Sequence, residues 1–394
     1  MLASSLVALA SLLAPLAALR VNATPLAERG VNVGWPYGSE KIRGVNIGGW
    51  LVIEPFITPS LFQNTGNDAI VDEWTFGQYQ DYNTAQNALV NHWNSWITED
   101  DFAQIAAAGL NHVRIPIGYW AYDISAGEPY HQGQAQYLDN AIGWARNHGL
   151  KVLIDLHGAP GSQNGYDNSG HRGSATWDQD PNNVLRTKNI IQSLSLKYSD
   201  PSYWQVGSAS KSGLAIAIHD AFQSLSYWNN YMTEPTFEDV FLDTHNYQVF
   251  NQDYQTWTQA QHISGICSQA GNYASSPLWL VVGEWSLASS DCAQWVNGRG
   301  LGARMDGSYP GSYYVNSCNG LSGSSSTWSS DYKTFLRKFY DAQTQVYENN
   351  GQGWIMWTWK TETSEDWSYQ AGLAGGWIPS DPTNHQYSVQ TLCG

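Results

Sequence analysis

Charged residues are scarce in this chain of 394 residues. Lysine, arginine, aspartate and glutamate make up only 13% of it, and the 34 acidic residues outnumber the 18 basic ones. The resulting net charge of −16 argues against nucleic acid and membranes as partners, because both bind basic surfaces. A neutral polymer is not excluded by this charge balance.

Long apolar runs are also lacking after the first residues, so no membrane-spanning segment is predicted in the mature chain. Residues 2–19 are almost wholly apolar, and small residues near position 23 offer a cleavage site, which predicts a signal peptide over residues 1–23. Residues 24–40 form a polar lead-in or a propeptide. No linker or charge block divides residues 41–394, so we expect one secreted domain, extracellular or in the cell wall.

Cysteine is rare too, with four residues that all lie in the C-terminal third: Cys267, Cys292, Cys318 and Cys393. Their spacing is not that of metal ligands, and no metal or cofactor is predicted. In a secreted chain an even number of cysteines favours two disulfides, and three connectivities are open.

Aromatic residues, in contrast, are plentiful, with 20 Trp and 23 Tyr. Many of them must be core residues, but aromatic faces with few charges around them also suit stacking against sugar rings.

Apolar strand patterns alternate with helical patterns along the chain. We expect helices over residues 99–108, 137–147 and 331–347, and strands over residues 43–50, 112–118, 151–157, 214–220, 240–247, 278–285 and 354–359. Such alternation indicates βαβ units and a parallel sheet. The fold class is therefore α/β, a (β/α)8 TIM-type barrel, although seven strands are one fewer than such a barrel has.

The run from Leu278 to Val282 is continuously apolar and is followed by Gly283 and Glu284. In a (β/α)8 barrel, catalytic residues lie at the C-terminal ends of strands. Taken alone, Glu284 could be a helix cap or an ion-pair partner. However, five further side chains lie at or just past other strand ends: Arg114, His157, His245, Tyr247 and Trp359. Their convergence favours an active site in which an arginine keeps Glu284 ionised as a nucleophile.

Long motifs carry a resemblance to a known family. They are Arg43 to Pro55, Leu156 to Gly165, Ile218 to Phe222, His245 to Phe250, Gly283 to Ser286 and Trp357 to Glu362. In these motifs the chain resembles the fungal exo-β-1,3-glucanases of glycoside hydrolase family 5, over nearly everything from Lys41 to Cys393.

The resemblance implies Glu284 as the nucleophile and Glu54 as a ligand of sugar hydroxyls. The −1 sugar subsite would be framed by Arg114, His157, His245, Tyr247 and Trp359. Tyr166 and Phe250 would form an aromatic clamp at the entrance. The implied disulfides are Cys267–Cys393 and Cys292–Cys318.

One element of the family pattern is missing. A retaining glycosidase needs two carboxyl groups, and in the family the acid/base is the Glu of an Asn-Glu-Pro motif after the fourth strand. Here residues 199–213 contain no Glu and are too few for a strand and a crossover helix. We expect the fourth β/α unit to be absent, displaced or supplied by Trp204 to Ser208. The acid in Thr233-Glu234-Pro235 is an alternative, but it follows the fifth family strand.

The resemblance therefore implies a secreted, monomeric hydrolase that releases glucose from the non-reducing end of β-1,3-glucan, with its acid/base not located. One alternative is a catalytically impaired glucan-binding pseudoenzyme, and another is a family 5 β-glucanase or cellulase of other linkage preference. The missing unit is either a segment lost from the predicted transcript, which we favour, or a genuine loss.

Overall fold

Seven parallel strands form one sheet in the described part of the chain. The computed structural model describes residues 35, 38–200, 214–233, 236–237 and 239–394. The strands are β1 (Ile42–Asn46), β2 (His112–Gly118), β3 (Lys151–Gly158), β4 (Ile216–His219), β5 (Val240–Asn246), β6 (Trp279–Trp285) and β7 (Gly353–Met356). Their order in the sheet is β3-β2-β1-β7-β6-β5-β4. The seven expected strands are thus all present.

The sheet is strongly curled. Strands β2 and β5 stand four places apart, which in a flat sheet would separate them by about 19 Å. Yet Nε of Arg114, on β2, lies 3.7 Å from Oδ2 of Asp243, on β5. Side chains from strands that are distant in the sheet order therefore meet on its concave side.

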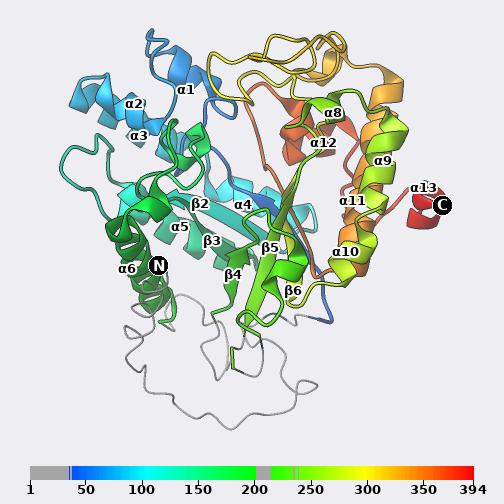
Figure 1. Ribbon diagram of the computed structural model, residues 1–394, viewed down its shortest axis with the longest axis horizontal. Helices are drawn as coiled ribbons and strands as arrows, with labels where there is room; N and C mark the ends of the chain where they lie inside the picture. The colour runs from blue at the N-terminus through cyan, green and yellow to red at the C-terminus, as the bar shows by residue number, and fades with distance from the viewer. Residues whose placement is uncertain (1–34, 36–37, 201–213, 234–235, 238) are drawn as a thin grey trace, which may run out of the picture. The chain divides into compact units, whose positions relative to one another are not determined.

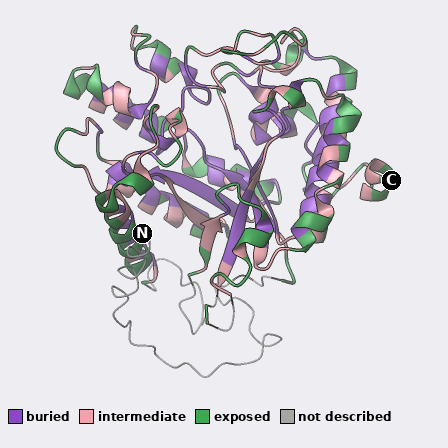
Figure 2. Cartoon of the chain, viewed as in Figure 1, coloured by how far each residue is buried: buried purple, intermediate pink, exposed green. Residues whose placement is uncertain are grey.

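The two edge strands are less buried than the others. Every residue of β2 is buried, whereas β3 is only half-buried along Lys151–His157 and β4 begins with an exposed isoleucine, Ile216. Figure 2 shows this gradient, with the buried residues gathered on the central strands. Strands β3 and β4 each lack a second neighbour among the described strands, and a closed barrel would leave no such edges.

Helices follow most strands. The longer ones are α3 (Tyr82–Ser95), α4 (Glu99–Ala107), α5 (Gln134–Asn147), α6 (Pro181–Tyr198), α9 (Gln259–Cys267) and α11 (Ser330–Asn350). The shorter ones are α1 (Pro59–Gln63), α2 (Glu73–Gln78), α8 (Gln252–Gln255), α10 (Ala270–Ala274), α12 (Tyr369–Gly375) and α13 (Val389–Cys393). Helices α9, α10 and α11 lie together on the right of Figure 1. Because α4 connects β1 to β2 and α5 connects β2 to β3, the expected βαβ organisation is confirmed there.

Local sequence explains where α4 begins. The carboxylate of Asp101 accepts a hydrogen bond of 2.9 Å from the backbone N–H of Thr98, which closes the first turn. Acidic residues at positions 99–101 also lie at the positive end of the helix dipole. The predicted start of this helix at residue 99 is therefore confirmed.

Two disulfides join the C-terminal third. Cys267, at the end of α9, is bonded to Cys393 in α13, and Cys292 is bonded to Cys318 in the loop after β6. These are the pairs that the family resemblance implies. The first ties the C-terminal helix to the body of the protein across 126 residues of sequence.

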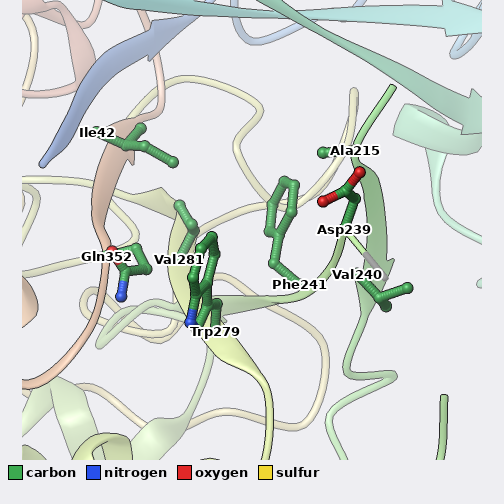
Figure 3. A pocket seen from close by; sticks show the side chains of 8 residues that line it. All are labelled: Ile42, Ala215, Asp239, Val240, Phe241, Trp279, Val281 and Gln352. Atoms are coloured by element: carbon green, nitrogen blue, oxygen red, sulfur yellow. The ribbon is translucent and has the colours of Figure 1, made fainter. Parts of the chain in front are cut away.

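An apolar pocket lies at the opposite end of the strands from Glu284. Its lining includes the first residues of β1, β5 and β6, namely Ile42, Val240 and Trp279, together with Ala215, Asp239, Phe241, Val281 and Gln352 (Figure 3). Catalytic side chains of parallel sheets gather at the other end, so this pocket is not the candidate site.

Some expectations fall outside the described residues. These are the signal peptide over residues 1–23, the replacement strand at Trp204 to Ser208, and Glu234. None of the helices in the described part of the chain is long and apolar enough to cross a membrane.

Candidate active site

Arg114 is the centre of the concave site. Its guanidinium group lies 2.6 Å from Oε1 of Glu284, 3.1 Å from Oδ2 of Asp155 and 3.7 Å from Oδ2 of Asp243. It also donates a hydrogen bond of 2.8 Å to Oδ1 of Asn46. Since Arg114 is 4% exposed, this buried cation compensates two buried acids, Asp243 and Glu284, and the half-buried Asp155, which come from three different strands.

Glu284 is held by donors on both carboxylate oxygens. Arg114 donates to Oε1, and the hydroxyl of Tyr247 donates to Oε2 over 2.9 Å. Burial alone would raise the pKa of Glu284, but the charges of His245 and Arg114 hold that pKa below its ordinary value. The carboxylate is therefore ionised and fixed in direction, as a nucleophile must be.

His245 bridges two of these acids. Its Nδ1 lies 3.3 Å from Oε2 of Glu284 and its Nε2 lies 3.6 Å from Oδ2 of Asp243. Burial lowers the pKa of His245, but Glu284 and Asp243 outweigh it, so the pKa is raised overall. Gly283 leaves room for this arrangement, because a Cβ at that position would meet Oδ1 of Asp243 at 1.9 Å.

His157 forms a pair with Asp155 on strand β3. Nδ1 of His157 lies 2.6 Å from Oδ2 of Asp155, and the same oxygen contacts Arg114. Neighbouring Arg114 and His157 overcome the effect of burial and lower the pKa of Asp155 below its ordinary value. Asp155 is therefore an acceptor, which makes Nδ1 of His157 the donor. The imidazole also stacks on Trp357, with ring centroids 5.5 Å apart.

Glu54 lies in the same region as Glu284, but its pKa is shifted in the opposite direction. It is 4% exposed, and its Oε1 has no hydrogen-bond partner among the described residues. Burial and the neighbouring acids Asp167 and Glu284 raise the pKa of Glu54 well above its ordinary value. This shift favours the neutral form of the carboxylic acid, which can both donate and accept hydrogen bonds. Asp167 is affected in the same way, and burial with the nearby Asp72 raises its pKa to about 7.

The two aromatic residues expected at the entrance are both exposed. Tyr166 is 63% exposed and Phe250 is 45% exposed. Phe250 contacts Tyr247 edge to face, with ring centroids 5.5 Å apart. Because Tyr247 donates a hydrogen bond to Glu284, a single ring lies between Phe250 and the nucleophile. Tyr166 directly precedes Asp167. The two rings do not contact each other in the described structure.

The structure corrects the expectation for Trp359. Its side chain is 1% exposed, its Nε1 donates to Asp101 in α4 over 2.9 Å, and its ring stacks on Tyr369. Trp359 is thus a core residue and does not frame the site. Trp357, two positions earlier, is the tryptophan that reaches it.

Sequence reasoning missed four residues of the site: Asn46, Asp155, Asp243 and Trp357. Asp155 and Asp243 each precede a predicted site histidine by two positions on the same strand. Because residues i and i+2 of a strand share one face, that spacing was the available signal.

The donor atoms of Asp155, His157 and Glu284 lie within 4.8 Å of one another, which invites comparison with a metal site. However, Arg114 contacts both carboxylates of this group. A cation there would face the guanidinium charge directly, so these residues do not fit a metal ion.

A second carboxylic acid at the place of the family acid/base is not found in the described structure. Asp155 and Asp243 are ionised partners of Arg114, and Glu54 follows β1, away from the gap between β3 and β4.

Comparisons with known proteins show which family this chain resembles. The family model "Cellulase (glycosyl hydrolase family 5)" matches residues 71–207. A glucan 1,3-beta-glucosidase of Yarrowia lipolytica is 42% identical over 92% of this chain and 93% of its own length. One from Blumeria graminis is also 42% identical, over 95% and 94% respectively.

Among solved structures, rutinosidase from Aspergillus niger superposes with a TM-score of 0.66 at 16% identity. It covers 86% of this chain and 98% of its own, which supports the fold alone. The sequence identities, which span more than nine tenths of both chains, decide the family. The chain belongs to the fungal glucan 1,3-β-glucosidases of glycoside hydrolase family 5.

Proposed function

We propose that this chain is an exo-acting retaining hydrolase of β-1,3-glucan with Glu284 as its nucleophile. The observation that carries the proposal is the carboxylate of Glu284, ionised and held between Arg114 and Tyr247. Such a carboxylate can attack an anomeric carbon and form a glycosyl ester. The relatives named above are glucan 1,3-beta-glucosidases, which supplies the substrate class.

The same proposal assigns the surrounding residues to the substrate. Glu54, Arg114, His157, His245 and Tyr247 would contact the −1 sugar, and Trp357 takes the place first expected for Trp359. Tyr166 and Phe250 would contact the sugar at the entrance. The domain would span residues 41–394 of a secreted monomer, after a signal peptide over residues 1–23.

We further propose that the fold is a (β/α)8 barrel without its fourth β/α unit. In support, β3 and β4 are sheet edges among the described strands. The alignment with the Yarrowia relative has 398 positions but spans 92% of this chain, about 362 residues, so about 36 positions fall in gaps of this chain. A βαβ crossover takes roughly 30 residues. The match to the family model also ends at residue 207, inside the short connection.

This loss has a definite chemical consequence. The departing sugar of a natural glucan is a poor leaving group that needs a proton, whereas a dinitrophenolate departs without one. Without the family acid, attack by Glu284 should remain fast on an activated glucoside and become slow on glucan.

We therefore expect kcat/KM for 2,4-dinitrophenyl β-glucoside to exceed that for laminaribiose by much more than their intrinsic reactivities explain. General acid catalysis is worth about 10²–10⁴-fold, and the deficit on laminaribiose relative to an intact relative should be of this size. Parallel assays of this chain and the Yarrowia enzyme measure it. Equal relative activity on both substrates would contradict the loss of the acid.

A non-catalytic glucan-binding protein is the second candidate, favoured by the missing acid together with the exposed rings of Tyr166 and Phe250. Such a protein would be retarded in a laminarin gel and would turn over neither substrate. Turnover of the activated glucoside that Glu284→Gln abolishes decides against it.

A further inference from the structure

We propose that Glu73 is a positioning residue that holds Glu54 in the sugar site without contacting the sugar itself. The inference rests on the proposed function, because Glu54 is there assigned to the −1 sugar beside Glu284. Glu73 is the first residue of α2, a short helix between β1 and β2, and it is 2% exposed. Its side chain therefore acts inside the protein.

Three N–H donors converge on the carboxyl group of Glu73. The backbone N–H of Ile53 donates to Oε2 over 3.0 Å, while Nε1 of Trp120 and Nε2 of Gln134 donate to Oε1 over 2.7 and 3.3 Å. All three donor residues are fully buried. Because a buried donor without an acceptor is unfavourable, these bonds fix the backbone at Ile53.

The bond to Ile53 bears directly on the next residue, Glu54. The carbonyl group of Glu54 accepts hydrogen bonds of 3.1 and 3.0 Å from the N–H groups of Ile57 and Thr58, so the backbone is held on that side as well. Oε1 of Glu54 has no hydrogen-bond partner among the described residues and is available to a sugar hydroxyl. The place of this oxygen therefore depends on the backbone that Glu73 holds.

Trp120 extends this connection to a second loop of the site. A Cβ added at Gly118, Gly158 or Gly170 would lie 2.3, 2.5 or 2.3 Å from its ring, so the indole fits only because these positions lack one. Gly118 ends β2, Gly158 ends β3, and Gly170 follows the 3-10 turn that begins at Asp167. The indole is thus wedged against the loop that follows β3.

The two neighbours of Glu73 in the chain bind that same loop. Oδ2 of Asp72 accepts a hydrogen bond of 2.6 Å from the backbone N–H of Arg172, and the N–H of Trp74 donates over 2.8 Å to the carbonyl group of Gly170. The start of α2 therefore binds both the loop after β1 and the loop after β3, which carry candidate sugar ligands.

Glu73 acts through its shape and its acceptor oxygens. Burial raises the pKa of Glu73 to about 8, although its three donors lower it, so the neutral form prevails at about pH 6. A neutral carboxyl group still accepts hydrogen bonds. An amide of the same shape should therefore preserve part of the function, whereas an apolar side chain should not.

Glu73→Met tests the assignment, because it removes both acceptor oxygens and keeps the length of the side chain. For 2,4-dinitrophenyl β-glucoside at about pH 6 we expect kcat/KM to fall by about 10-fold or more, the size of one buried hydrogen bond. The loss should be smaller in Glu73→Gln, which keeps one acceptor. If Glu73→Met does not fold, Glu73→Gln takes its place in the cycle described next.

A double-mutant cycle with Glu54→Gln separates positioning from general damage. If Glu73 acts through Glu54, then Glu73→Met should lower kcat/KM by less than about 2-fold once Glu54 has been replaced. Asp341→Leu is the matched control, because Asp341 is a fully buried acid of α11 that accepts from the N–H groups of Gln386 and Tyr387. It should lower the midpoint of urea unfolding and leave kcat/KM unchanged.

Three results would overturn the inference: additive losses in the cycle, no loss in Glu73→Met, or a similar kinetic loss in Asp341→Leu. Covalent labelling of Glu284 by an activated fluoroglucoside is measured in parallel on the unmodified chain. If labelling is normal and one of these results is found, only this inference fails. Absent labelling of a folded chain means that the proposed function fails.

Discussion

Insertion of a complete fourth β/α unit between Tyr198 and Leu214 is expected to raise kcat/KM on laminarin by about 10²–10⁴-fold. The segment would come from the Yarrowia relative and carry the Asn-Glu-Pro motif. Its strand would pair with β3 on one side and β4 on the other, closing the two open edges of the sheet. Its Glu would protonate the departing sugar.

The matched control is the same insertion with Gln in place of the motif Glu. It should show the gain in thermal stability that edge closure gives, without the gain in activity. Equal laminarin activity of the unmodified chain and the Glu-bearing insertion would show that this chain already has a full acid/base.

The second large effect is expected from Arg114→Met. This substitution leaves the buried Asp243 and Glu284 and the half-buried Asp155 without their shared cation. Removing one partner of a buried ion pair typically destabilises a protein by about 3–5 kcal/mol. We expect a loss of at least this size at pH 7 in urea unfolding.

The pH dependence of that loss has a definite sign. In the unmodified protein the pKa values of Glu284 and Asp243 are below their ordinary values, so these acids stabilise the fold at neutral pH, and this contribution decreases as the pH falls below about 4. In Arg114→Met the pKa values of both acids rise relative to the unmodified protein, although His245 still lowers them, so protonation at low pH partly relieves the burial of charge in the variant. The difference in unfolding free energy should therefore be larger at pH 7 than at pH 4. A loss that is the same at both pH values would mean that Arg114 stabilises the fold by packing alone.

Much of the site could be predicted from sequence because parallel strands bring their C-terminal ends together. Glu284, Arg114, His245 and Tyr247 were each expected at a strand end, and the structure brings all four into contact, although Arg114 is the third of the seven residues of β2. The count of seven strands followed from the same patterns.

Trp357 and Trp359 show that a strand pattern does not predict where side chains lie once the strand has ended. Trp357 and Trp359 are two positions apart and would share a face on a regular strand. However, β7 ends at Met356, and the chain changes direction beyond it, so one ring reaches His157 and the other enters the core beside α4. Where a strand ends depends on its pairing partners, which the local pattern does not record.

Asp155 and Asp243 were missed for a different reason. Each is an acid inside an apolar run, which alone indicates only a tolerated polar residue. Their role depends on Arg114, which is distant in sequence, and on the curl that brings β2, β3 and β5 together.

The most direct test of the proposed nucleophile is labelling with 2,4-dinitrophenyl 2-deoxy-2-fluoro-β-glucoside, followed by peptide mapping. The fluorine slows release of the glycosyl ester, and the leaving group removes the need for an acid. We expect one fluoroglucosyl group per chain, attached to the peptide that contains Glu284. Labelling at another residue, or none in a chain that remains folded, would contradict Glu284 as the nucleophile.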